Sequence, residues 1–252
     1  MPRPDSERSG ALFYLGASLI ALCFLPFAAF GIPLPAATLP WQRQIIGAAF
    51  SAICLLGALA GISPSTCSRL SPSKPKLGEP SRTANTNSGG PIGRRVQKQG
   101  HHATCSNYGS HVVHIAGAVH CAGCTGLVLG AATALAGSTL YFFVGIPLPC
   151  PLFAFWLGFA GVALGLLQHP LYALFRTRRG GVRVVVNITF VVGAFLLLSS
   201  VADLTGNLML EAFLLLAILY WIFTRIAMSR RSHREICTRC GDKGCPLSEA
   251  PD

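Results

Sequence analysis

The amino-acid sequence predicts an all-α, polytopic integral membrane helix bundle with about six transmembrane helices. Two observations on composition predict this class: hydrophobic residues make up 52% of the 252 residues, and charged residues make up only 12%. Soluble domains usually carry about 25% charged residues. The third observation is that the apolar residues gather in long blocks, and about 20 such residues span a bilayer as a helix. A helix is expected because backbone amides have no water to bind in hydrocarbon.

Six apolar blocks have the length of a span. The first follows a leader of mixed charge and exceeds the apolar core of a signal peptide, so we interpret it as a retained span. Residues 64–100, after the second block, are rich in Ser, Pro, Gly and basic residues and have no hydrophobic period, which is typical of a disordered linker. The expected spans are residues 11–31, 44–63, 123–146, 152–175, 184–202 and 208–228.

The linker divides the chain into a two-span hairpin (1–63) and a four-span unit (101–228) with a Cys/His-rich entry segment, followed by a cysteine-rich tail (229–252). Small residues recur at four-residue spacing in the third and fourth spans, and such rows let helix backbones approach closely in lipid. These small residues are Gly126, Gly130, Ala134, Gly161 and Gly165.

The basic residues predict the orientation of the spans. If the N-terminus is cytoplasmic and six spans alternate, 19 of the 20 Lys and Arg residues fall in cytoplasmic segments, and only Arg43 falls outside. This asymmetry is the one expected of a cytoplasmic (inner or plasma) membrane protein, and it places both termini in the cytoplasm. The partners expected for the basic segments are the bilayer and its anionic lipid headgroups. The basic residues are scattered through loops without a nucleic-acid-reading module, so no nucleic-acid partner is expected.

The first group of cysteines on the predicted cytoplasmic side precedes the third span. It consists of Cys105, Cys121 and Cys124, with His114 and His120 nearby. The cytoplasm keeps thiols reduced, so clustered cysteines there indicate a metal site or catalysis rather than disulfides. On a continuous helix, the two cysteines of the Cys-x-x-Cys pair share one face. A short turn or hairpin before the helix is an equally good interpretation of this segment.

The second group lies in the tail and has the spacing His-x3-Cys-x2-Cys-x4-Cys. Its four potential ligands are His233, Cys237, Cys240 and Cys245. Zinc accepts this mix of sulfur and nitrogen, and closed four-coordinate sites are typically structural. The two groups predict zinc, or another soft or borderline metal, in two separate sites or in one site shared by both Cys-x-x-Cys pairs. A redox dithiol and unligated thiols are the alternatives.

The sequence HIAGAVHCAGCTGLVLG (114–130) resembles a family of small prokaryotic membrane proteins with a Cys-x-x-Cys-Thr-Gly motif just before a span (domain of unknown function 2085). The resemblance covers about residues 105–200. Where the family has His after the upstream Cys and often Arg between the paired cysteines, this chain has Ser106 and Gly123. No established activity comes with the family, so the resemblance implies only a membrane protein with a metal site. The matching positions are Cys105, Cys121, Cys124, Thr125 and Gly126.

Polar residues inside the expected spans are costly and often mark a pathway. We expect Asn187 to bond a neighbouring helix, Asp203 and Glu211 to be solvated at the interface, and Arg225 to snorkel toward water. The favoured function is non-catalytic, with a cytoplasmic-face metal site in a structural or interaction role. One alternative is a transporter for metal ions or small solutes, and another is a membrane thiol oxidoreductase. The transport path would be lined by Gln168, His169 and Asn187.

Overall fold

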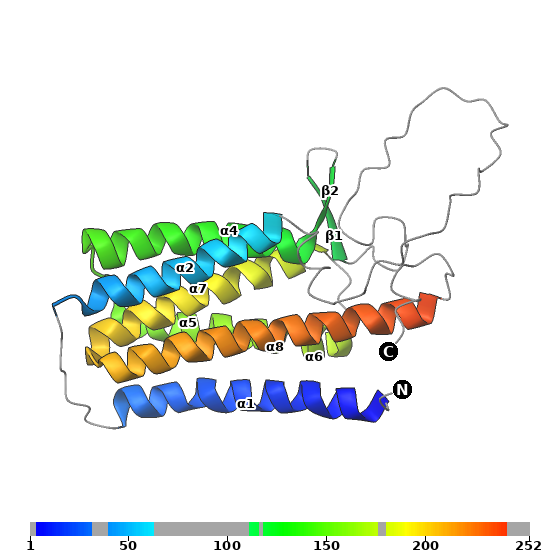
Figure 1. Ribbon diagram of the computed structural model, residues 1–252, viewed down its shortest axis with the longest axis horizontal. Coiled ribbons are helices and arrows are strands. Elements are labelled where there is room, and N and C mark those ends of the chain that lie inside the picture. The colour runs from blue at the N-terminus through cyan, green and yellow to red at the C-terminus, as the bar shows by residue number, and fades with distance from the viewer. Residues whose placement is uncertain (1–3, 32–39, 63–110, 116–117, 176–179, 241–252) are drawn as a thin grey trace, which may run out of the picture.

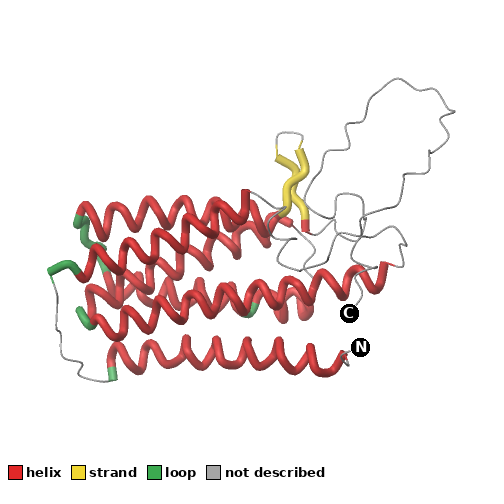
Figure 2. Tube along the Cα trace, viewed as in Figure 1, coloured by secondary structure: helices red, strands yellow, loops and turns green. Residues whose placement is uncertain are grey.

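A computed structural model describes residues 4–31, 40–62, 111–115, 118–175 and 180–240. Within these residues the predicted all-α class is confirmed, and five helices are long and apolar enough to cross a membrane. The long helices run side by side along one axis, with a small β-hairpin at one end of the bundle (Figures 1 and 2). The membrane-embedded bundle is therefore the architecture that positions every site described below.

The elements follow the expected blocks closely. Strands β1 (Val112–Ile115) and β2 (Ala118–Cys121) form an antiparallel hairpin just before α4 (Ala122–Ser138). A π-helical turn, η3 (Thr139–Val144), extends α4 at its other end. The α-helices are α1 (Pro4–Phe30), α2 (Gln42–Ile62), α4 (Ala122–Ser138), α5 (Pro151–Leu166), α6 (Gln168–Phe175), α7 (Gly180–Thr205) and α8 (Leu208–Cys240).

The fourth expected span is not one continuous helix. It divides at Leu167 into α5, with 16 residues, and α6, with 8 residues. Pro170 explains the division, because proline has no amide proton to donate to the carbonyl of Leu166 and its ring collides with that carbonyl in a regular helix. At 1.5 Å per residue α5 is about 24 Å long, which is shorter than the ~30 Å hydrocarbon core. The expectation of six complete single-helix spans therefore fails at this helix.

Glycines bring α7 into close contact with two neighbours. A Cβ atom on Gly158 of α5 would lie 2.7 Å from the Gly193 carbonyl oxygen and 2.8 Å from the Leu197 nitrogen, both in α7. Gly126 and Gly130 of α4 face the α7 backbone in the same way. In its most apolar window α7 is 56% buried, against 22–33% for the other four long helices. The predicted rows of small residues are thus confirmed as helix-packing surfaces.

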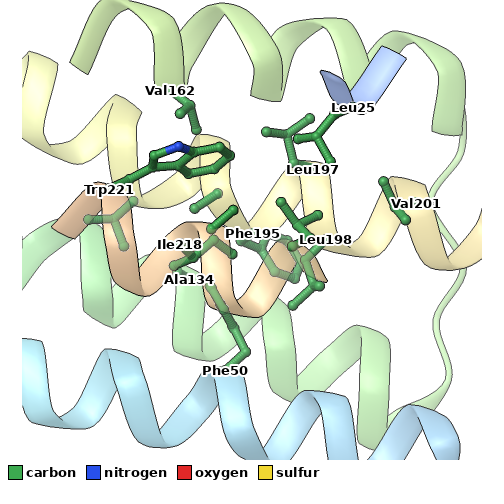
Figure 3. Close-up of a cluster of buried hydrophobic side chains, with 14 of the residues drawn as sticks. Leu25, Phe50, Ala134, Val162, Phe195, Leu197, Leu198, Val201, Ile218 and Trp221 are labelled. Carbon is green, nitrogen blue, oxygen red and sulfur yellow. The ribbon is translucent and has the colours of Figure 1, made fainter. Parts of the chain in front are cut away.

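The helices before the linker pack against different helices that follow it. α1 lies mainly against α8, where Trp221 Nε1 donates to the Ser18 carbonyl at 3.1 Å and the Ser18 and Thr224 hydroxyls are 2.8 Å apart. α2 lies mainly against α4, with the Ser51 and Ser138 hydroxyls 3.0 Å apart. Side chains from several helices, Phe50 and Trp221 among them, fill the space between (Figure 3).

Large apolar side chains cover the outside of the bundle. Ile20 is 74% exposed, Leu56 is 68% exposed and Leu216 is 66% exposed, each on a different helix. Soluble proteins rarely expose apolar surface over so many neighbouring positions. This surface supports a membrane-embedded protein whose outer side chains contact lipid.

The two ends of the bundle differ. We name the end that carries the β-hairpin, the start of α4, helix α6, the start of α7 and the end of α8 the cysteine end (Figure 1). The opposite end, where α2 and α8 begin, is named the far end. The alternating direction of the helices therefore gathers at one end the elements that carry most of the described Cys and His residues.

A leucine in place of Gly158 tests the contact between α5 and α7. We expect Gly158→Leu to lower the free energy of unfolding by about 2–3 kcal/mol, because the nearest atoms are backbone and cannot move aside cheaply. Gly16→Leu in α1 is the matched control, since a Cβ there meets nothing within 4 Å. Thermal unfolding in detergent, followed by tryptophan fluorescence, measures both variants. Equal stability of the two would contradict the close contact.

Candidate functional site at the cysteine end

The Cys-x-x-Cys pair lies across the junction between the hairpin and α4. Cys121 is the last residue of β2 and the N-cap of α4, with extended backbone angles, and Cys124 is in the first helical turn. The Thr125 hydroxyl donates to the Cys121 carbonyl at 2.9 Å. The hairpin interpretation is confirmed and the continuous helix through this segment is wrong, because the chain reverses direction before the pair instead of approaching it as a helix.

The strand register places the predicted histidine ligands on two faces. Val112 pairs with Cys121 and His114 pairs with Val119, so His114 and Cys121 share one face of the hairpin. His120 pairs with Val113 and lies on the opposite face. Both histidines are exposed, whereas Cys121 and Cys124 are half-buried. The hairpin thus gives Cys121 one histidine on its own face.

The structure does not bring a complete set of predicted metal ligands together. Across the described ranges, no three His, Cys, Asp or Glu side chains lie close enough to hold a metal ion. Cys105 and Cys245 fall outside those ranges. Of His233, Cys237 and Cys240 only the helical backbone of α8 is described. The metal site therefore stays a prediction.

Arg183, in the first turns of α7, connects the hairpin to α6. Its Nη1 lies 3.4 Å from His111 Nδ1, just before β1, and its guanidinium carbon lies 4.6 Å from the centre of the Tyr172 ring. The guanidinium also interacts electrostatically with Cys121. A cation beside a thiol favours the thiolate, which is the form that binds metal and acts as a nucleophile.

A second arginine lies deeper at the same end. Arg225 of α8 donates through Nη2 to Gln168 Oε1 of α6 and to Asn187 Oδ1 of α7. Its guanidinium carbon lies 4.4 Å from the centre of the Phe190 ring. The predicted bond from Asn187 to a neighbouring helix is confirmed. The predicted snorkelling of Arg225 is wrong, because two amide oxygens and an aromatic face inside the bundle take the place of water.

We name Gln168, Tyr172, Arg183, Asn187 and Arg225 the arginine cluster. Asn187 joins its two arginines, since its Nδ2 also donates to the Arg183 carbonyl at 2.7 Å. Three donors in the cluster are buried without a hydrogen-bond partner: Arg183 Nε, Arg225 Nη1 and the Tyr172 hydroxyl. Sequence reasoning missed Tyr172 and took Arg183 only as a topology signal, because neither residue forms a recognisable spacing motif.

Two acidic residues, Asp203 and Glu211, lie at the far end. Glu211 is only 1% exposed and accepts a hydrogen bond from Gln42 Nε2 at 2.7 Å, so the expectation that it is solvated is wrong. Asp203 is exposed, as expected, and accepts a hydrogen bond from the Tyr141 hydroxyl. Tyr141 lies in the π-helical turn, and Arg43 lies 4.6 Å above its ring. The sequence gives no signal for this turn, so Tyr141 escaped notice.

Fold and site together define a membrane-embedded helical bundle with a cysteine-bearing hairpin and a half-buried arginine cluster at one end. Comparisons with protein-family models, with curated proteins and with solved structures give no match. The resemblance to the Cys-x-x-Cys-Thr-Gly family therefore stays a hypothesis.

Replacing Asn187 tests the structural part of the arginine cluster. We expect Asn187→Leu to lower the free energy of unfolding by about 1–3 kcal/mol, because a buried guanidinium loses one of its acceptors. Thr189→Val is the control on the same helix, since the Thr189 hydroxyl bonds only to the Val185 carbonyl of α7 itself. Chemical or thermal unfolding in detergent compares them. An Asn187→Leu protein as stable as the control would show that the bond to Arg225 contributes little.

Proposed function

We propose that this chain is an integral membrane protein in which Cys121 and Cys124 contribute to a zinc site with a structural or interaction role and no catalytic one. The observation that carries the proposal is the position of the pair at a strand-to-helix junction. Cys121 is the N-cap of α4 and Cys124 is in its first turn. The hairpin and α4 therefore hold the backbone that carries both sulfurs. A metal bound at this junction would fix the hairpin to the bundle.

Electrostatics support the same proposal. Arg183 favours the thiolate form of Cys121, and zinc binds thiolate rather than thiol. A zinc ion with three or four thiolate ligands carries net negative charge, so a neighbouring guanidinium is attracted to the completed site. The cation that helps to prepare the ligand would therefore also stabilise the loaded site.

The remaining ligands would come from the hairpin and the residues before it, or from the cysteine-rich tail. His114 shares the hairpin face of Cys121, and Cys105 precedes the hairpin in the sequence. The tail residues His233, Cys237, Cys240 and Cys245 belong to the end of α8 or follow it, and α8 ends at the cysteine end (Figure 1). One shared site or two separate sites both satisfy zinc's preference for four ligands.

We further propose that the cysteine end faces the cytoplasm of an inner or plasma membrane. Most basic residues in the described ranges lie at the cysteine end, whereas Arg43 is at the start of α2, at the far end. This distribution supports the proposed orientation. The reducing compartment would keep the cysteines available for metal, and the basic segments would contact anionic headgroups.

The proximity of Arg183 to Cys121 also favours a second function, that of a membrane thiol oxidoreductase. A stabilised thiolate is the reactive species in thiol–disulfide exchange, and a Cys-x-x-Cys pair is the usual arrangement for it. The half-buried setting of both cysteines is compatible with either chemistry. Metal content therefore separates the two functions.

Elemental analysis of the purified full-length protein tests the zinc proposal. We expect about one or two zinc ions per chain in the wild type, and a loss of zinc in Cys121→Ser and in Cys124→Ser with a lower Tm, because structural zinc contributes directly to folding. Cys150→Ser is the matched control, since Cys150 is an exposed thiol before α5 at the far end. Wild-type protein without metal, with Cys121 and Cys124 titrating as accessible thiols, would overturn the proposal. Reversible formation of a Cys121–Cys124 disulfide would then favour the oxidoreductase.

A further inference from the structure

Positive charge without an acidic partner is concentrated in the arginine cluster. The guanidinium of Arg183 stacks on the Tyr172 ring, and that of Arg225 also interacts electrostatically with Tyr172, so Tyr172 lies near both arginines. Over the described part of the chain, no carboxylate contacts either guanidinium. Asp203 lies at the end of α7 and Glu211 at the start of α8, both at the far end.

Such an arrangement is costly unless a negative charge completes it. Removing a charged group from water costs several kcal/mol, and neutral amides such as those of Gln168 and Asn187 offset only part of that cost. Buried charges in proteins are accordingly paired or bound to ligands. Among the described residues no carboxylate supplies that charge, and a Cys121 thiolate would lie beside Arg183 only.

The unused donors show where that anion would bind. Five buried side-chain polar atoms lack a partner among the described residues, and three of them belong to this cluster. They are the Nε of Arg183, the Nη1 of Arg225 and the hydroxyl of Tyr172. Gly165 of α5 keeps the place of Nη1 open, because a Cβ there would lie 2.7 Å from that nitrogen. The hydrogen bonds to Gln168 and Asn187 use Nη2, so these three donors keep unused hydrogen-bonding capacity.

We infer that Arg183, Arg225 and Tyr172 form a binding site for a phosphate-bearing anion. A tetrahedral oxyanion offers several acceptors, and the rigid fork of a guanidinium matches phosphate in geometry as well as in charge. The depth is also suitable: Arg183 is in the first turns of α7, and Arg225 is close to the end of the apolar part of α8. The anion would come either from a lipid headgroup at this surface of the bilayer or from a free phosphate.

Tyr172→Phe is the most informative variant. It removes only the hydroxyl and keeps the ring over which Arg183 is stacked. Without ligand, we expect this variant to be as stable as the wild type or more stable, because the hydroxyl has no partner to lose. With ligand, we expect its affinity to fall about tenfold, and that of Arg183→Gln to fall at least as much. Arg230→Gln is the charge-matched control, since Arg230 is an exposed arginine of α8 at the same end.

The experiment uses the purified full-length protein in an uncharged detergent. One arm titrates inorganic phosphate against sodium chloride at equal ionic strength and records Tm, which rises when a ligand binds only the folded state. The other arm adds phosphatidylglycerol or phosphatidylcholine and counts bound lipids by native mass spectrometry. Binding of phosphate supports the site with a free anion as its ligand. Retention of phosphatidylglycerol alone supports it with a lipid headgroup.

Three outcomes would overturn the inference. The first is the absence of binding in both arms. The second is equal binding by the wild type, Tyr172→Phe and Arg183→Gln, or an equal loss in Arg230→Gln, which would indicate general attraction to a basic surface. The third is a clear destabilisation of unliganded Tyr172→Phe, which would show that the hydroxyl already has a partner. The comparisons are made between variants at equal metal content, so the inference stands or falls separately from the zinc proposal.

Discussion

The close contact of α7 with α4 and α5 is the constraint on which the rest of the structure depends. Glycines on the neighbouring helices let the α7 backbone approach so closely that no side chain fits between them. In lipid, where apolar surface gives little drive for association, such contact depends on dispersion and on small residues. The same contact fixes Arg183 and Asn187 of α7 relative to α6 and α8, so the packing of the apolar middle sets the geometry of the polar cysteine end.

The polar side chains at the two ends of the bundle differ in their charges. The far end holds Asp203 and Glu211 with Arg43 close to the same network, and its carboxylates accept hydrogen bonds from Tyr141 and Gln42. The cysteine end holds two arginines whose partners are neutral amides and aromatic rings. Each buried group thus has neighbours that reduce its desolvation cost, but no carboxylate among the described side chains contacts the two arginines.

Sequence reasoning succeeded where the signal is local and failed where it depends on partners distant in the sequence. The length and polarity of the apolar blocks gave the long helices, and four-residue spacing gave their packing faces. The break at Leu167 had a local signal in Pro170, although the apolar block continues past it. The inward orientation of Arg225 had no such signal, because its acceptors are 57 and 38 residues away. The cysteine pair was visible from its spacing, whereas Tyr172 became significant only when folding placed it near two arginines.

Arg183 belongs to both parts of the cysteine end, and this shared position links them. Its guanidinium interacts with Cys121 on one side and stacks on Tyr172 on the other. A guanidinium carries a single charge, so a thiolate and a phosphate placed on its two sides would divide its attraction between them. A zinc site with three or four thiolate ligands keeps a net negative charge, so it would hold the guanidinium and repel the phosphate. If both proposals hold, metal at the hairpin and anion in the arginine cluster therefore weaken each other, and by reciprocity each lowers the affinity for the other by the same factor.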